Sequence, residues 1–96
     1  IEVHTPLELE SALDISPEII GVNSRNLKTL DVDAQAFSEL IPQIPTTIAR
    51  VAESGISTRE EVAFAHSNGA TAILVGEALV RAGDPRVAIN QLLGRL

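Results

Sequence analysis

The chain alternates short apolar runs with helical patterns, and this alternation constrains its fold more than any other feature. Four runs have the composition of β-strands: "IEVH" (1–4), "EIIGV" (18–22), "TIARVA" (47–52) and "TAILVG" (71–76). The last three are nearly all apolar, which is typical of strands covered on both faces in a parallel sheet. Strands that alternate with helices predict an α/β architecture with right-handed crossovers.

Helical patterns fill the intervals between these runs and the segment after the last run. The expected helices cover 5–15, 33–41, 57–70 and 84–96, with a short helical turn over 77–83. Three of them begin at a residue whose side-chain oxygen can cap the first turn. These candidate N-caps are Thr5, Ser57 or Thr58, and Asp84, and Pro6 and Pro85 suit the first helical positions.

The apolar spacing predicts which side of each helix packs inward. The residues expected to share a face are Leu9, Ala12 and Leu13, then Phe37, Leu40 and Ile41, then Val62, Ala65 and His66. The segment "IPQIP" (41–45) is expected to be a loop or the entry to an edge strand, because Pro42 and Pro45 would break a helix.

Two architectures fit this order of elements, an open doubly wound sheet and a (β/α)₈ barrel, of which four strands are half. Ninety-six residues allow one domain or part of a larger one. The chain begins with Ile1 inside an expected strand, which suggests a fragment of a longer protein. We therefore treat residues 1–96 as one unit, either a complete small domain or half of a barrel.

Composition excludes several classes of function. Thirteen acidic residues against seven basic ones give a net charge of −6, which argues against binding nucleic acid. The absence of Cys excludes disulfides and thiolate zinc sites, and the two His have no metal-ligand spacing. We expect no metal and no cofactor. No apolar run approaches the ~20 residues of a membrane span, and no signal peptide opens the chain, so we expect a cytoplasmic protein without membrane contact.

Polar residues follow the strands at the points where the strands end, as in "VAESGIS" (51–57). The carboxyl ends of parallel strands lie on one side of a sheet, which carries the ligands in barrels and in open sheets. Four segments are therefore expected to converge on one mouth. The residues concerned are Glu2, Asn23, Ser24, Arg25, Glu53, Ser54, Gly55, Gly76 and Glu77.

Structural explanations compete with this functional one. Asn23 and Ser24 are also common turn formers, and Glu2 and Arg25 are also compatible with solvated surface positions. Glu53 directly follows apolar strand residues, so its charge needs a partner wherever it is buried. Gly55 and Gly76 allow close approach of the backbone to a phosphate, which barrels often bind after strands seven and eight beside a short helix.

At this point the sequence resembles a known family. The segments "IEVHT", "IIGVNSRNLKTLDVD", "VAESGIST" and "GATAILVGEALVRAGDP" together resemble the C-terminal half of indole-3-glycerol-phosphate synthase. The resemblance implies a TIM barrel of which these are strands five to eight. It also implies an activity in tryptophan biosynthesis, in which 1-(2-carboxyphenylamino)-1-deoxyribulose 5-phosphate undergoes ring closure with loss of carbon dioxide and water.

The resemblance also assigns roles to residues at the strand ends. Glu2 is implied in acid–base work on the dehydration, Asn23 in hydrogen bonds to substrate, and Glu53 in stabilising positive charge. Substrate contacts are implied for Arg25, Ser54 and the apolar wall residue Leu74. Gly55, Gly76 and Glu77 are implied at the phosphate, with Glu77 using its backbone N–H and its carboxylate facing outward.

The family's two essential lysines belong to the first half of the barrel, and the single lysine here, Lys28, does not correspond to either. The resemblance therefore implies that this chain is inactive without the missing N-terminal half. A homodimer of two half-barrels is a further hypothesis, because unpaired edge strands invite association. Two other functions stay open: a phosphate-binding half-barrel without catalysis, and another phosphate-binding barrel enzyme such as a phosphoribosylanthranilate isomerase.

Overall fold

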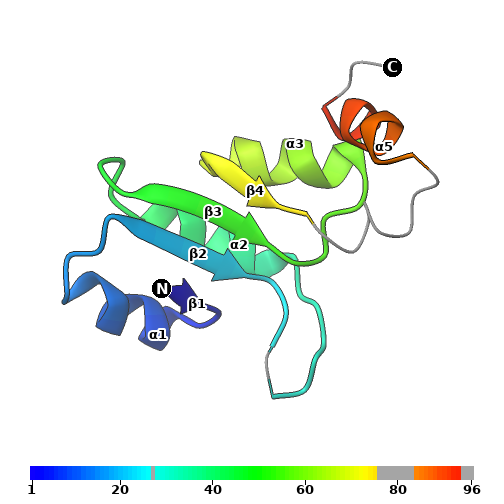
Figure 1. The fold of residues 1–96 in the computed structure, drawn as a ribbon. Helices are drawn as coiled ribbons and strands as arrows, with labels where there is room; N and C mark the ends of the chain where they lie inside the picture. Colours follow the sequence, from blue (N-terminus) through cyan, green and yellow to red (C-terminus); the bar gives the residue numbers. More distant parts are fainter. Residues whose placement is uncertain (27, 76–83, 94–96) are drawn as a thin grey trace.

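The computed structural model describes residues 1–26, 28–75 and 84–93, and its four strands form one parallel sheet (Figure 1). The strands are β1 (Glu2–Val3), β2 (Ile19–Asn23), β3 (Ala49–Glu53) and β4 (Ala72–Leu74). The helices are α1 (Pro6–Leu13), α2 (Gln35–Leu40), α3 (Arg59–Ser67) and α5 (Pro85–Leu92), with a short 3₁₀ helix, η1 (Ile41–Gln43), after α2. The predicted alternation of strands and helices is confirmed.

The order of the strands distinguishes between the two expected architectures. The strands lie side by side in chain order, β1-β2-β3-β4. A doubly wound sheet reverses its strand order at a switch point, whereas a barrel adds each strand next to the one before it. The sheet is therefore built as a run of barrel strands.

The two faces of the sheet have different neighbours. Strand residues alternate between faces, and register partners lie on the same face. Val3, Val22 and Ala52 are aligned across three strands and are buried in one core with residues of the helices. Figure 1 shows α2 and α3 behind the sheet, on this side. The opposite face, which we call the open face, carries Glu2 and Glu53.

The helix starts follow the predicted capping. The Thr5 hydroxyl accepts the Glu8 amide and the Thr58 hydroxyl accepts the Glu61 amide, each within a complete capping box. Thr58, not Ser57, is the cap of α3, and Asp84 caps α5 through the Arg86 amide. The turn expected over 77–83 lies outside the described residues.

The predicted helix faces are largely confirmed. Leu9 and Ala12 are buried with Leu13 packed against them, and Phe37, Leu40 and Ile41 are all buried. On α3, Ala65 is buried and Val62 is partly buried, whereas His66 is exposed and lies outside the packed face.

The expectation of a loop at 41–45 is wrong for its first three residues. Ile41–Gln43 form the 3₁₀ helix, which continues directly from α2. Pro42 falls in its first turn, where the missing N–H leaves no hydrogen bond unmade. Ile41 and Ile44 are both buried, so packing of these two side chains favours the tight turn.

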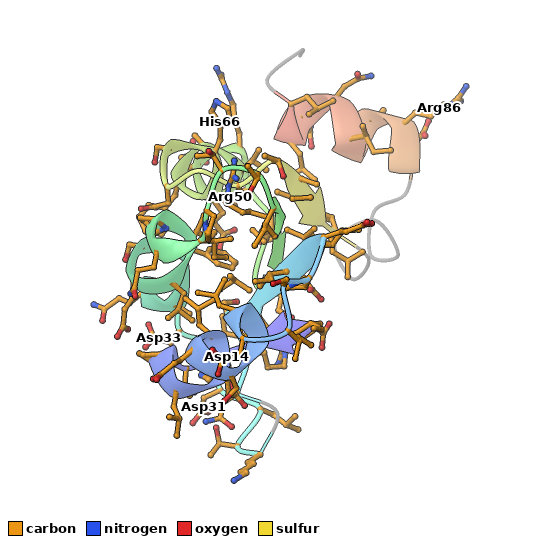
Figure 2. All side chains as sticks on the ribbon, turned by 90° about the vertical axis from the view of Figure 1, so that its left-hand side faces the viewer. Asp14, Asp31, Asp33, Arg50, His66 and Arg86 are labelled. Atoms are coloured by element: carbon orange, nitrogen blue, oxygen red, sulfur yellow. The ribbon has the colours of Figure 1, made fainter. Side chains whose placement is uncertain are left out.

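Arg50 ties together the amino-terminal edge of the sheet. Its guanidinium donates to the carbonyls of Gly69 at 2.6 Å and Ile48 at 2.9 Å, and more weakly to Pro45 at 3.3 Å. Figure 2 shows Arg50 below the exposed His66, near the end of α3. In barrels this edge serves stability and the opposite edge carries the chemistry. Arg50 is therefore a structural residue.

Candidate active site

The open face brings three of the predicted site residues to the carboxyl ends of neighbouring strands. Asn23 ends β2 and Glu53 ends β3, and the two are register partners. Leu74 ends β4 and is the register partner of Glu53. Because partners in a sheet lie on the same face, all three side chains belong to one row at the mouth. The predicted convergence of strand ends is confirmed for Asn23 and Glu53.

Glu53 lies across β2, directly over Gly21. A Cβ atom added to Gly21 would overlap Oε2 of Glu53 and lie 2.9 Å from its Cδ. The same added atom would lie 3.7 Å from Cγ of Glu2, which is the register partner of Gly21 on β1. The side chains of Glu2 and Glu53 therefore meet above Gly21, which has no side chain of its own.

Glu53 is buried, with 7% of the residue exposed, and its pKa is raised to about 7. Burial is the largest cause of this rise, and a hydrogen bond with the Glu2 carboxyl and the negative charge of Glu2 contribute to it. Two carboxyl groups can hydrogen-bond each other only when one of them holds a proton. Glu53 is therefore arranged to take up and release a proton near neutral pH.

Ser24 joins the loop after β2 to the loop after β3. Its hydroxyl donates to the Ser54 carbonyl at 2.9 Å, and its amide donates to the Glu53 carbonyl at 3.0 Å. Its own carbonyl accepts the Asp33 amide at 2.7 Å. Ser24 is completely buried, so these bonds are shielded from water. The ends of the two strands that carry Asn23 and Glu53 are thus held together.

The turn after Glu53 has an unusual backbone. Ser54 and Gly55 both have positive φ, 69° and 68°, a conformation that residues other than glycine rarely adopt. A Cβ on Gly55 would lie 2.7 Å from Cγ1 of Val32 and 3.1 Å from Oγ of Ser24. Gly55 is therefore required by the turn and by its neighbours. Its predicted contact with phosphate stays a prediction.

The loop after β2 arranges Asn23 and Arg25. The Asn23 side-chain oxygen accepts the Arg25 amide at 2.9 Å, and the Arg25 guanidinium donates to the Leu30 carbonyl at 2.9 Å. His4 donates from Nδ1 to the backbone carbonyl of Asn23 at 2.6 Å, which ties the end of β1 to the end of β2. Asn23 is thereby held from both sides.

A cavity of about 360 Å³ opens beside Glu2 and Asn23. It lies between the β1–α1 loop and the loop after β2, and its walls include His4, Asn26 and Lys28. This volume is within the range of small-ligand sites. Lys28 thus lies near the mouth, on a loop rather than on a strand.

Two predicted phosphate residues, Gly76 and Glu77, lie outside the described residues. Two residues that shape the site were not predicted as members of it: Gly21 and His4. Gly21 had a detectable signal, since glycine is unfavourable inside a strand and marks a close approach. In the described ranges, no group of three or more His, Cys, Asp or Glu residues is placed to hold a metal ion. None of the helices described there is long and apolar enough to cross a membrane.

The parallel strands in chain order, with helices between them, define the chain as part of a (β/α)₈ barrel. Solved structures agree. A chain of the Amycolatopsis orientalis BexX/CysO complex superposes with a TM-score of 0.68 at 28% identity, covering 98% of this chain and 42% of that one. The native KDPGal structure superposes with a TM-score of 0.63 at 22% identity, covering 98% of this chain and 44% of that one.

The chain belongs to the indole-3-glycerol phosphate synthase family, whose model matches residues 1–92. Proteins named indole-3-glycerol phosphate synthase from Kineococcus radiotolerans and Rhodococcus jostii are 52% and 50% identical over 94 residues. Indole-3-glycerol phosphate synthase 1 of Streptomyces coelicolor is 45% identical over 93 residues. Each alignment covers 97% of this chain, but the chain spans only about a third (34–35%) of the length of these relatives.

Proposed function

We propose that the full-length protein containing these residues is an indole-3-glycerol phosphate synthase, a carboxy-lyase of tryptophan biosynthesis. Its substrate is 1-(2-carboxyphenylamino)-1-deoxyribulose 5-phosphate, which closes to the indole with release of one carbon dioxide and one water. The observation that carries this proposal is the Glu2–Glu53 carboxyl pair beside Asn23, on the open face of a chain that belongs to this family.

The geometry supports separate roles for the two carboxyl groups. An ionised Glu53, fixed and shielded from water, stabilises positive charge that develops at the anilino nitrogen during ring closure. Glu2 is more exposed and serves acid–base steps in the dehydration. Asn23 supplies a hydrogen-bonding group between them.

Further contacts with the substrate come from the surrounding loops. Arg25, Ser54 and Leu74 line the substrate in this proposal, whereas Gly55, Gly76 and Glu77 face its phosphate. Support for Leu74 is its place in the same row as Glu53. Support for Ser54 and Gly55 is the left-handed turn directly after Glu53.

The proposal requires the rest of the barrel. The family's two lysines come from the first half, so the 96 residues alone are predicted to be inactive. The predicted partners are thus the N-terminal half-barrel and a small phosphorylated substrate. A homodimer of the fragment and a cytoplasmic location stay predictions. The family match favours the synthase over an isomerase and over a non-catalytic half-barrel.

Assay of the full-length protein for formation of indole-3-glycerol phosphate tests the proposal. Replacing the Glu53 carboxylate in Glu53→Gln is expected to lower kcat by about 10²–10⁴-fold, the usual range for a group of this kind. Glu10→Gln, at an exposed site on α1, is the matched control and is expected to keep full activity. A full-length protein without turnover, or Glu53→Gln with unchanged kcat, would overturn the proposal. Turnover by residues 1–96 alone would overturn the requirement for the missing lysines.

A further inference from the structure

We propose that Gly21 is a positioning residue for catalysis: its missing side chain creates the space in which the Glu53 carboxyl crosses β2 to meet Glu2. The expected effect on catalysis rests on the proposed function, whereas the position of the Glu53 carboxyl over Gly21 does not depend on that function. Gly21 touches neither substrate nor reacting atoms in this proposal. It acts through Glu53.

The backbone at Gly21 does not itself need glycine. Among the described glycines, positive φ is found at Gly55 and Gly69, not at Gly21. Inside a strand, glycine is less favourable than residues with a side chain, because it loses more conformational freedom and packs nothing. A reason other than conformation must therefore explain glycine at the centre of β2.

The surroundings of Gly21 supply that reason. Its register partners are Glu2 on β1 and Val51 on β3, and the residues before and after it, Ile20 and Val22, face the buried core. Gly21 thus opens toward the face that carries the carboxyl pair. An added Cβ would overlap Oε2 of Glu53 and lie 2.9 Å from Cδ, so the carboxyl itself would have to move.

Moving this carboxyl has a chemical consequence. The Glu53 side chain would turn away from Glu2 and from the row it shares with Asn23. Displacements of about 1 Å can lower catalytic rates by on the order of 100-fold, because reacting groups must be held in near-attack geometry. A methyl group at position 21 is therefore expected to lower kcat far more than it changes substrate binding.

A double-mutant cycle in the full-length protein tests this inference. Gly21→Ala is expected to lower kcat by about 100-fold in the wild-type background. In a Glu53→Ala background the overlap no longer exists, so adding Gly21→Ala is expected to change neither the residual rate nor the melting temperature. Ala49→Val, which adds carbon atoms to an exposed position on the open face at the start of β3, is the matched control and should keep kcat within about twofold.

A second measurement does not depend on activity. Titration of the Glu53 side-chain carboxyl by ¹³C NMR is expected to show its pKa fall toward the ordinary value when Gly21→Ala separates it from Glu2. If Gly21→Ala alone does not fold, the Gly21→Ala/Glu53→Ala protein is still expected to fold, which itself indicates that the clash is with Glu53.

The outcomes separate this inference from the proposed function. A wild-type protein without synthase activity contradicts the proposed function, and the NMR titration still tests the position of Glu53. The inference would be overturned if the Gly21→Ala variant had the same kcat as the wild type and the same pKa at Glu53. Equal losses with and without the Glu53 side chain would also overturn it, because Gly21 would then matter to the strand rather than to the carboxyl.

Discussion

The helix-covered face and the open face of the sheet differ in what the same four strands bury. On the covered face, Val3, Val22 and Ala52 form a dry aliphatic layer against the helices. On the open face, Glu53 is buried beside another carboxyl group, while Leu74 remains 61% exposed. Neighbouring residues of one strand thus face opposite sides of the sheet. One packs in the aliphatic core, and the next belongs to the open face with its carboxyl pair.

The difference shows where the stability of the site originates. Burying a carboxyl group costs free energy unless it is paired or protonated, so the open face cannot be the main source of stability. Burial of the aliphatic side chains on the covered face offsets this cost. The hydroxyl and backbone hydrogen bonds of Ser24 hold the polar ends of β2 and β3 in fixed positions. Four predictions test this division, from the largest expected effect to the smallest.

Leu40→Ala should weaken the covered face most. Leu40 is fully buried, and removing three carbon atoms from such a site costs about 2–5 kcal/mol in free energy of unfolding. Chemical denaturation of the full-length protein measures this cost. Leu7→Ala is the matched control on α1, where the side chain is 73% exposed, and should change stability by less than about 0.5 kcal/mol. Similar losses in both variants would contradict the packing of α2 against the sheet.

Glu53→Gln should change how stability depends on pH. The pKa of Glu53 is about 7 in the folded chain and near 4.5 when unfolded, so the folded state holds the proton more tightly. This contribution is complete below pH 4.5 and is lost as the pH rises through 7. Relative to Glu53→Gln, the wild type should therefore lose up to about 3 kcal/mol between these limits.

Denaturation curves at several pH values measure this difference, with Glu10→Gln on α1 as the matched control. A stability gap between wild type and Glu53→Gln that does not vary with pH would show that the carboxyl pair is absent. The opposite sign, with the wild type gaining on the variant as the pH rises, would indicate a cation beside Glu53 instead of Glu2.

Ser24→Ala should loosen the link between the ends of β2 and β3. The substitution removes the buried hydrogen bond to the Ser54 carbonyl and leaves that carbonyl without its partner, which costs about 1–3 kcal/mol. Ser38→Ala is the matched control, because the Ser38 hydroxyl also donates to a carbonyl, that of Gln35 at 3.0 Å, but at an exposed site. Equal effects of the two substitutions on thermal unfolding would show that burial of the Ser24 bond adds nothing.

Much of the fold follows from signals that act over a few residues. The capping boxes at Thr5 and Thr58 join residues three apart, and the aliphatic runs that become β2 and β3 are continuous in the sequence. These patterns predicted the elements correctly. The 3₁₀ helix at Ile41–Gln43 was missed because the prolines of this segment indicate a loop. The burial of Ile41 and Ile44, which the local pattern does not show, favours the helical turn.

The site depends on contacts between residues that are far apart in the sequence. Strand ends predicted that Asn23 and Glu53 converge, since the topology of a parallel sheet suffices for that step. The bond between Ser24 and Ser54 spans 30 residues, and the space above Gly21 exists only once β1, β2 and β3 are in register. No local pattern contains such information, so the bond between Ser24 and Ser54 and the space above Gly21 were identified only in the structure.

Thr58→Ala tests the smallest effect. Thr58 lies between the turn after Glu53 and α3, one of the helices that cover the sheet. The Thr58 hydroxyl accepts the Glu61 amide at 3.2 Å, and Glu61 Oε1 in return accepts the Thr58 amide at 3.0 Å. Losing such a cap costs about 1 kcal/mol, because the amides of the first turn lose their partner. Thermal unfolding measures it, with Thr46→Ala at an exposed loop position as the matched control.

Because Ser54–Gly55 precede α3 by only a few residues, this variant also tests how independent the two faces are. If the bonds of Ser24 hold the turn, Thr58→Ala should lower the melting temperature and leave kcat of the full-length protein in the synthase assay unchanged. A loss of kcat at temperatures well below unfolding would show that the helix start, rather than Ser24, positions the turn after Glu53. The division between a stabilising covered face and an open face that carries the candidate site would then fail at this junction.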